Sequence, residues 1–305
     1  MVSEVPGPDP APAQVSDPAS EAPKKDHGRA GRNLPAAIGV GVALGAYLVG
    51  TLIWFKPGFV ALLAVALALG SVELYSALRR HGLHAQIVPI VIGIIPITVG
   101  SYLAGLTNPV VFSTTSVLLA SLALTVLACL IWRIPKGPNG YVTDVAASLM
   151  IIGYVPLLGS FGALMLAGEN GSARLVTFLL VVVMSDTGGY VLGALFGRHP
   201  MVPKISPKKS WEGFAGSVLF GTVASVLMTV YVLGRSVWVG LILGVALVVV
   251  GTAGDLIESM IKRDLGIKDM SSFLPGHGGV MDRLDSLLVA APVAWLIMYL
   301  LVPGG

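Results

Sequence analysis

Charged residues are scarce in this chain of 305 residues, since only 11% are Asp, Glu, Lys or Arg while 55% are hydrophobic. A soluble domain carries about 25% charged residues to cover its surface, so an ordinary soluble protein is excluded. Intrinsic disorder is excluded for most of the chain as well, because disorder accompanies low hydrophobicity and high charge. The composition predicts a polytopic membrane protein.

Cysteine is nearly absent too, and several familiar motifs are missing. Cys129 is the single cysteine, so an intrachain disulfide framework is excluded, and its apolar neighbours indicate a packing role. A net charge of +3 is too small to bind nucleic acid strongly, and we expect no nucleic-acid partner. The phosphate loops of soluble nucleotide-binding folds and zinc-type His/Cys spacings are also lacking.

Residues 1–33 differ from everything after them. They are rich in Pro, Ala, Ser and charge and show no apolar period, which predicts a disordered cytoplasmic tail. A secretory signal is not indicated, because the first apolar run begins only near Leu34.

Apolar stretches of the length that crosses a bilayer as an α-helix, about 20 residues, fill the rest of the chain. Their continuous rather than alternating pattern excludes a β-barrel. We therefore expect an all-α fold with about nine transmembrane helices, the first two forming a hairpin about Lys56-Pro57. The expected spans are Leu34–Phe55, Pro57–Leu78, Gln86–Ala104, Asn108–Trp132, Tyr141–Ala167, Leu175–Phe196, Gly213–Leu233, Val237–Glu258 and Leu284–Val302.

The distribution of Lys and Arg predicts the orientation. With the N-terminus in the cytoplasm, 16 of the 19 basic residues fall on the cytoplasmic side, and only Lys56, Arg174 and Arg235 fall outside. This bias follows the positive-inside rule. We expect a multi-pass protein of the cell membrane whose polar loops face the cytoplasm.

Acidic residues divide the membrane region into two parts. Eight of the 11 acidic residues beyond the tail lie between Asp186 and Asp285. We therefore expect a transmembrane scaffold over residues 34–170 and a catalytic region over residues 171–305.

Two polar features precede the last third of the catalytic region. Lys204, Lys208, Lys209 and Ser210 lie in a Pro-rich loop that suits phosphate groups, although lysines at a membrane face also serve topology alone. Asp186 lies in an apolar run before Thr187 and two glycines, and a carboxylate at such a position usually marks a functional site. The alternative for Asp186 is a neutral carboxyl group bonded to a neighbouring helix.

Carboxylates gather at two helix ends. One helical face carries, at spacings of three and four, Asp255, Glu258, Ser259 and Lys262. Asp282 and Asp285 begin the last span, where acids also suit a plain capping role. Both clusters end at the same membrane face, so we expect the carboxylates to converge near the lysine loop, an arrangement that suits Mg²⁺ bound together with substrate phosphates.

A glycine-rich segment, Pro275–Gly279, lies between these clusters. Its three glycines surround His277 and allow close backbone approach to an anion.

The stretch from Ser259 to Asp285 resembles the signature of the phosphatidate cytidylyltransferases, also called CDP-diacylglycerol synthases. The matching positions are Ser259, Lys262-Arg263, Lys268-Asp269, Pro275, His277-Gly278-Gly279, Asp282-Arg283 and Asp285. The segments Asp186–Tyr190 and Ser206–Ser210 also resemble elements of this family, with Ser210 where threonine is more usual. The resemblance extends over the chain from about residue 34.

The resemblance implies the reaction of CTP with phosphatidic acid to give CDP-diacylglycerol and pyrophosphate. It also implies Mg²⁺, with a second metal or a monovalent cation as a possible addition, membrane lipids as surroundings and a homodimer. By the same resemblance, the catalytic residues are Asp255, Asp282, Lys262, Arg263 and His277. The substrate-binding residues are Lys204, Lys208, Lys209, Ser210, Ser259, Lys268, Asp269, Gly278, Gly279 and Arg283, and the metal ligands are Asp255, Asp282, Asp285 and Asp186.

Two other functions stay open at this point. A CTP-dependent polyprenol or dolichol kinase has a looser form of the same loop. A cation-coupled transporter also uses intramembrane acids, but the spans show no internal repeat and the charges gather at one face.

Overall fold

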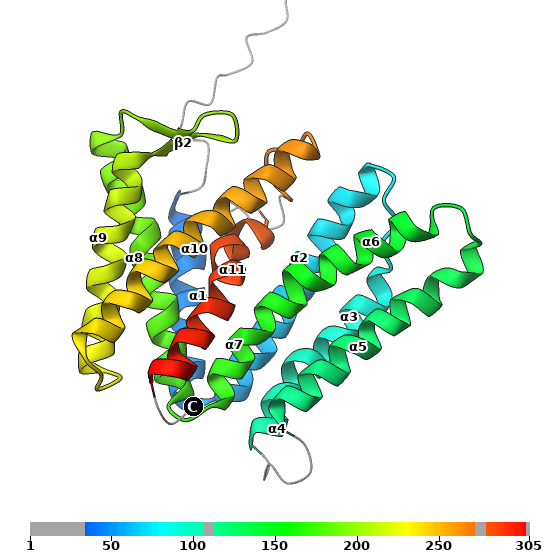
Figure 1. Ribbon diagram of the computed structural model, residues 1–305, viewed down its shortest axis with the longest axis horizontal. Helices are drawn as coiled ribbons and strands as arrows, with labels where there is room; N and C mark the ends of the chain where they lie inside the picture. Colours follow the sequence, from blue (N-terminus) through cyan, green and yellow to red (C-terminus); the bar gives the residue numbers. More distant parts are fainter. Residues whose placement is uncertain (1–33, 107–112, 272–278, 303–305) are drawn as a thin grey trace, which may run out of the picture.

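The computed structural model describes residues 34–106, 113–271 and 279–302, and within these ranges it is helical apart from one small hairpin (Figure 1). The predicted tail, residues 1–33, lies outside the described residues. In chain order the elements are α1 (Leu34–Trp54), α2 (Lys56–Arg80), α3 (Ile87–Ile95), α4 (Ser101–Leu106), α5 (Thr114–Arg133), α6 (Tyr141–Ile152), α7 (Leu158–Ala167), α8 (Gly171–Phe196), β1 (Pro200–Val202), β2 (Ser206–Ser210), α9 (Trp211–Tyr231), α10 (Val237–Asp264) and α11 (Met281–Leu301).

Two of the predicted spans are helices interrupted by a wider turn. A π-helical turn over Pro96–Gly100 joins α3 to α4, and another over Gly153–Leu157 joins α6 to α7. Each turn contains a proline, Pro96 or Pro156, whose missing N–H breaks the regular α-helical ladder. The helix continues beyond each turn, and the two resulting spans cover Ile87–Leu106 and Tyr141–Ala167.

Within the described residues, eight helices are long and apolar enough to cross a membrane, which confirms an all-α polytopic protein. The first predicted span coincides with α1, in which the fully described stretch Gly45–Trp54 is an apolar helix shorter than a membrane span. The ninth span therefore stays a prediction. The helix α10 continues to Asp264, beyond its predicted end at Glu258, so the signature residues that follow Glu258 begin on a helix.

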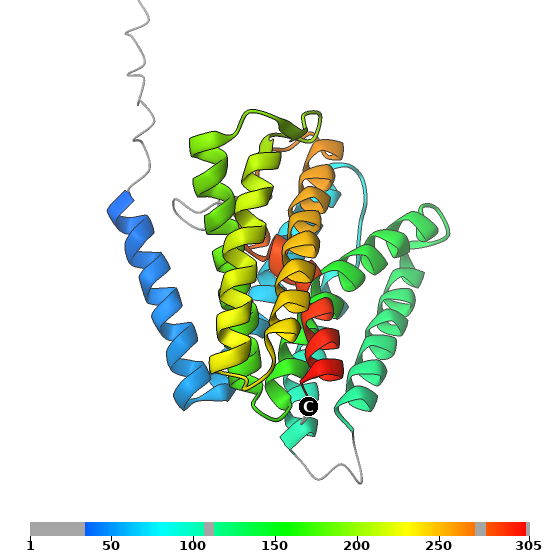
Figure 2. The same cartoon turned by 60° about the vertical axis from the view of Figure 1, so that its left-hand side comes forward.

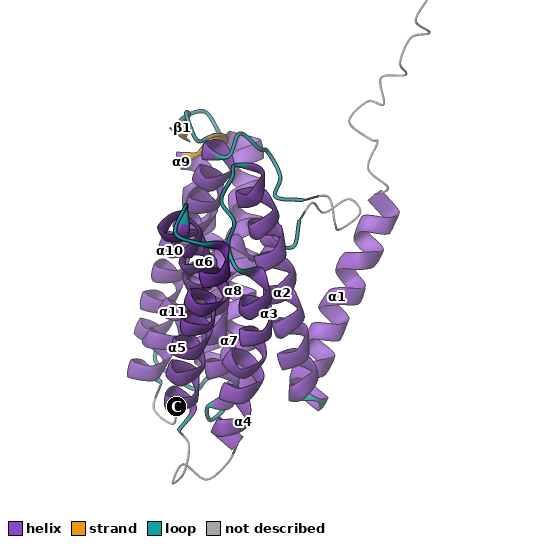
Figure 3. Ribbon diagram, turned by 90° about the vertical axis from the view of Figure 1, so that its right-hand side faces the viewer, coloured by secondary structure: helices purple, strands orange, loops and turns teal. Residues whose placement is uncertain are grey.

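The helices form one bundle in which chain neighbours are mostly spatial neighbours. The helix α8 packs along α9, α9 along α10 and α10 along α11, while α11 and α8 both contact α7 (Figures 1 and 2). The helix α1 forms a hairpin with α2, as predicted, and leans away from the bundle toward its Leu34 end (Figures 2 and 3). The loops 81–86, 134–140 and 197–210 lie at one end of the bundle (Figure 1). The Lys and Arg in these loops or at the helix ends beside them, such as Arg79, Arg80 and Arg133, therefore share one face, as the charge count predicts.

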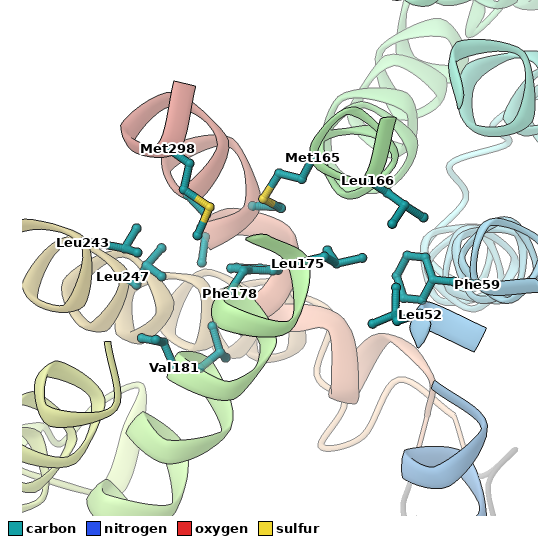
Figure 4. Packing of buried hydrophobic residues seen from close by; sticks show 14 of the residues in the cluster. Leu52, Phe59, Met165, Leu166, Leu175, Phe178, Val181, Leu243, Leu247 and Met298 are labelled. Atoms are coloured by element: carbon teal, nitrogen blue, oxygen red, sulfur yellow. The ribbon is translucent and has the colours of Figure 1, made fainter. Parts of the chain in front are cut away.

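The main core lies where α8, α10, α11, α7 and the α1–α2 hairpin meet. Phe178 and Leu175 of α8 point into it and meet Leu243 of α10, Met298 of α11 and Leu166 of α7 (Figure 4). Cys129 is buried in a second cluster around α2, α3 and α6, in agreement with a packing role.

Glycines set the distance between α8 and α9. A Cβ atom at Gly188 would overlap the carbonyl oxygen of Gly216, and a Cβ atom at Gly216 would overlap that of Gly188. Small residues at a helix interface allow this close backbone approach inside a membrane. The glycines that follow Asp186 therefore hold α8 against α9.

The loop between α8 and α9 folds into an antiparallel hairpin, β1–β2, which the sequence analysis describes only as a Pro-rich loop. Its end is fixed to α9, because the hydroxyl of Ser210 accepts a hydrogen bond from the N–H of Gly213 at 3.1 Å. The Glu212 carboxylate accepts hydrogen bonds from the N–H groups of Arg198 and His199. These contacts hold Lys208 and Lys209 over the end of the bundle.

Candidate active site

A polar cavity of about 200 Å³ lies between α8, the β1–β2 hairpin, α9 and α10. Asp186 on α8 and Asp255 on α10 line it together with Lys208 and Lys209 of β2. These four residues are far apart in sequence and were all predicted site residues. The fold brings them to one place.

An ion pair connects the hairpin to α10 across this cavity. The Lys209 Nζ lies 2.6 Å from the Asp255 Oδ2, and the same Nζ donates to the carbonyl oxygen of Thr252 at 3.4 Å. Arg263, further along α10, donates from its Nε to the carbonyl of Ile205 at 3.3 Å. The hairpin is therefore held to α10 through groups that also suit phosphate binding.

A second cavity, of about 220 Å³, lies beside the first and is strongly basic. Lys208 lines both cavities and so lies between them. The other charged groups of the second cavity come from the signature segment, and they are Lys262, Arg263, Lys268 and Asp269. The predicted phosphate-binding cations thus form a continuous row.

Lys262 is the centre of a charged cluster. Its Nζ lies 2.5 Å from the Glu258 Oε2 and 2.9 Å from the Asp282 Oδ1. Asp282 also accepts a hydrogen bond from the N–H of Gly279 at 2.8 Å. Glu258 is only 1% exposed, so its charge is compensated by Lys262 rather than by water. This cluster connects α10 to the beginning of α11.

The side chains of Asp255 on α10 and Asp285 on α11 are within hydrogen-bond contact of each other. We call these two residues the Asp255–Asp285 pair. Gly254 makes this contact possible, because a Cβ atom there would lie 2.6 Å from the carbonyl oxygen of Asp285. Asp186 and Asp255 also interact electrostatically. The carboxylates therefore converge at one end of the bundle, as the sequence analysis predicts.

Glu73 belongs to the site but was missed by the sequence analysis. This buried carboxylate of α2 accepts hydrogen bonds from the N–H groups of Val280 at 3.0 Å and Met281 at 2.8 Å, and from the hydroxyl of Ser271. The free N–H groups at a helix beginning favour a negative partner. A lone carboxylate in an apolar span was the available signal.

Tyr154 is a second residue that the sequence analysis did not select. It lies in the π-helical turn between α6 and α7 and interacts electrostatically with Glu258, Asp285 and Asp255. Its buried hydroxyl and the Glu258 Oε1 both lack a hydrogen-bond partner among the described residues.

The remaining predicted residues are placed as follows. Ser259 lines the basic cavity, Lys204 lies exposed in the turn between β1 and β2, and Ser210 lines the first cavity as well as capping α9. Gly279 is packed against the carboxylates of Glu73 and Asp282, where a Cβ atom would not fit. Arg283 is exposed on the first turn of α11 and interacts electrostatically with Asp186. His277 and Gly278 lie outside the described residues.

The carboxylates of the site offer oxygen atoms that could bind a metal ion, but they do not by themselves make up a full set of metal ligands. Across the ranges 34–106, 113–271 and 279–302, no set of three or more His, Cys, Asp or Glu side chains has the arrangement of a metal site. The contact between Asp255 and Asp285 and the unpaired Glu258 Oε1 nevertheless fit a divalent cation. Mg²⁺ commonly takes only one or two protein carboxylates and completes its shell with water and substrate phosphates.

The fold and the site together define a class, namely a polytopic all-α membrane protein with two cavities lined by basic residues at one end of its bundle. The chain belongs to the cytidylyltransferase family, whose sequence pattern matches residues 35–301. It is therefore an enzyme of the nucleotidyltransferase class.

Individual relatives agree with the family match. A Mycobacterium leprae protein named phosphatidate cytidylyltransferase is 43% identical to this chain over an alignment of 293 residues that covers 91% of each chain. A Mycobacterium bovis protein of the same name is 42% identical over an alignment of 296 residues that covers 93% of this chain and 94% of that protein. A Staphylococcus saprophyticus protein of that name is 37% identical over 156 residues, covering 51% of this chain and 59% of that protein.

Proposed function

We propose that the protein is a phosphatidate cytidylyltransferase, which joins CTP and phosphatidate to give CDP-diacylglycerol and pyrophosphate. A phosphate oxygen of the lipid attacks the α-phosphorus of CTP, and the bond to the bridging oxygen breaks, so that pyrophosphate leaves with the electron pair. The observation that carries the proposal is the row of cations that lines the two cavities, beside the Asp255–Asp285 pair.

The cations of the two cavities supply what this reaction needs most. The attacking phosphate is already anionic, so the reaction depends on positioning and charge neutralisation rather than on a general base. Lys262, Arg263 and Lys268 suit the triphosphate from the basic cavity, and Lys208 reaches both cavities. Lys209 pairs with Asp255 in the first cavity.

A divalent cation, which we propose to be Mg²⁺, would be held by Asp255 and Asp285 with Asp186 nearby. When bound, it would neutralise developing charge on the phosphoryl oxygens and orient the two phosphates. Asp282 occupies a different position, because Lys262 and the N–H of Gly279 already bind it. We infer that Asp282 orders the beginning of α11 and supports the metal site from there.

The proposed substrates indicate the membrane in which the protein lies and the side that its site faces. CTP is a cytoplasmic nucleotide and phosphatidate is a membrane lipid, so we propose that the charged end of the bundle faces the cytoplasm at the cell membrane. The family resemblance also implies a homodimer, which light scattering of the purified protein in detergent tests.

The experiment uses the full chain in mixed micelles of detergent and phosphatidate, with CTP and Mg²⁺. We expect CDP-diacylglycerol from the wild type, and a loss of at least about 100-fold in kcat/KM for Asp255→Asn, because the substitution removes a charge from the phosphoryl-transfer centre. Asp264→Asn is the matched control, since Asp264 lies exposed on the same helix.

Two results would contradict the proposal. One is a wild type that forms no CDP-lipid but phosphorylates a polyprenol at the expense of CTP, which would indicate a lipid kinase. The other is equal activity of the wild type and the Asp255 variant, which would place the reaction elsewhere in the molecule.

A further inference from the structure

A second kind of cavity lies deeper in the bundle and is entirely apolar. It has a volume of about 130 Å³ and is enclosed by α1, α2, α7, α8 and α11. Within the described part of the chain, its lining consists only of Leu, Phe, Ala and Gly. A cavity of this composition has no group that would hold a nucleotide or an ion.

One face of the helix α8 carries lining residues of both the apolar cavity and the polar cavity. Leu175, Phe178 and Leu179 line the apolar cavity, and Asp186 lines the polar one. The buried Val182 lies between them at helical spacing, so all five residues share one face of the helix. From Leu179 to Asp186 the rise is about 10 Å, since each residue adds about 1.5 Å.

The helix α11 also carries lining residues of the apolar cavity close to a charged group. Leu284 and Leu287 line the apolar cavity, and Arg283 precedes them on the first turn of the helix. Arg283 and Leu287 are four residues apart and so lie on one face. Arg283 also interacts electrostatically with Asp186 of the polar cavity. A guanidinium group therefore lies on α11 between the lining of the apolar cavity and the polar site. Guanidinium groups suit phosphate especially well.

We propose that this cavity holds part of an acyl chain of the lipid substrate. The lipid phosphate would then lie at Arg283, next to the polar cavity. The inference rests on the proposed function and extends it to the determinant of chain recognition. Among the components of the reaction, only an amphiphile with a phosphate at one end and a hydrocarbon chain at the other matches both regions. The helix α1, which supplies Leu48 to the lining, leans away from the bundle toward its Leu34 end (Figures 2 and 3).

The test narrows the cavity without altering the polar site. Ala66 is a lining residue of α2, and Ala66→Phe would fill part of the cavity. We expect kcat/KM for dioleoyl phosphatidate to fall about tenfold, while kcat/KM for dihexanoyl phosphatidate changes less than about twofold. Ala61→Phe is the matched control, because Ala61 is exposed on the same helix.

A milder variant keeps the test valid if Ala66→Phe fails to fold. Gly162 also lines the cavity, and a Cβ atom there would lie 3.4 Å from the Leu63 Cδ2, which the packing accommodates. Gly162→Ala should reduce the preference for the long chain in the same direction and by less. Equal loss with both lipids for the two variants would overturn the acyl-chain proposal and leave the proposed function intact. A wild type inactive with both lipids would overturn the function and the acyl-chain proposal with it.

Photocrosslinking identifies the occupant directly. Phosphatidate carrying a diazirine on its acyl chain should label residues of α7 or α11 that line the cavity, and Ala66→Phe should reduce this labelling severalfold. Phosphatidylcholine with the same chain should label these positions far less. Equal labelling by both lipids would mean that any membrane lipid fills the cavity, and it would overturn the proposal.

Discussion

At the scale of single residues, the carboxylates of the site differ in what they bind. Glu258 and Asp282 share one cation, Lys262, whereas Asp255 contacts Asp285 and pairs with Lys209. Buried ion pairs contribute little net stability, but the loss of one partner is strongly destabilising. The Lys262 cluster therefore holds α10 against the beginning of α11 and orients Lys262 at the basic cavity, while the Asp255–Asp285 pair is the proposed metal-binding pair.

Glu73 offers a test at this scale. Glu73→Gln keeps one acceptor oxygen but turns an NH2 donor toward the N–H group of either Val280 or Met281, so that one of the two hydrogen bonds is lost. We expect kcat to fall about tenfold, the size of effect seen when a residue that orients site groups is removed. Glu169→Gln, at an exposed position in another loop, should leave kcat unchanged. A Glu73→Gln variant with full activity would show that the beginning of α11 does not depend on this contact.

At the scale of elements, helix packing sets the distances within the site. The helices α8, α9 and α10 each supply one wall of the polar cavity, and Gly188 and Gly216 let the first two approach closely. A displacement of α8 would move Asp186 away from Lys209 and Asp255. The packing of α8 and α9 is thus part of the site.

Gly216→Ala tests this packing. The added methyl group would overlap the backbone of α8 at Gly188, and overpacking of this kind destabilises by about 1–3 kcal/mol. We expect a lower melting temperature in detergent together with reduced activity. Gly45→Ala on α1, where a Cβ atom meets nothing within 4 Å, is the control. An unchanged melting temperature for Gly216→Ala would refute the close approach of the two helices.

Most elements and much of the site were predictable from the sequence, for identifiable reasons. Apolar runs such as Tyr141–Ala167 had the length of a span, and the spacing of Glu258 and Lys262 already implied contact on one helix face. The β1–β2 hairpin was not predicted, because its short strands lack an alternating pattern. Glu73 was missed because its partners, Val280 and Met281, are remote in sequence and its role appears only when α2 packs beside α11.

At the scale of the whole molecule, the charges define two unlike ends. The loops 81–86, 134–140 and 197–210 gather at the end that carries the site (Figure 1). The positive-inside rule then predicts that this end is cytoplasmic. The arrangement lets a water-soluble nucleotide and a membrane lipid meet at one boundary.

The single native cysteine makes this orientation easy to measure. Cys129 is 1% exposed, so it should react little with a membrane-impermeant maleimide. Lys204→Cys in the hairpin turn and Ser236→Cys in the exposed loop before α10 place new thiols at opposite ends. In intact cells we expect labelling of Ser236→Cys and protection of Lys204→Cys. The reverse pattern would place the site outside the cytoplasm.

The most direct test of the central claim follows the two ends of CTP. The wild-type protein is supplied with phosphatidate, Mg²⁺ and CTP labelled either in the α-phosphate or in the γ-phosphate. We predict that the α-label moves into the lipid and that the γ-label leaves as pyrophosphate. Transfer of the γ-label to a lipid, with the α-label retained in soluble CDP, would contradict cytidylyl transfer and identify the protein as a lipid kinase.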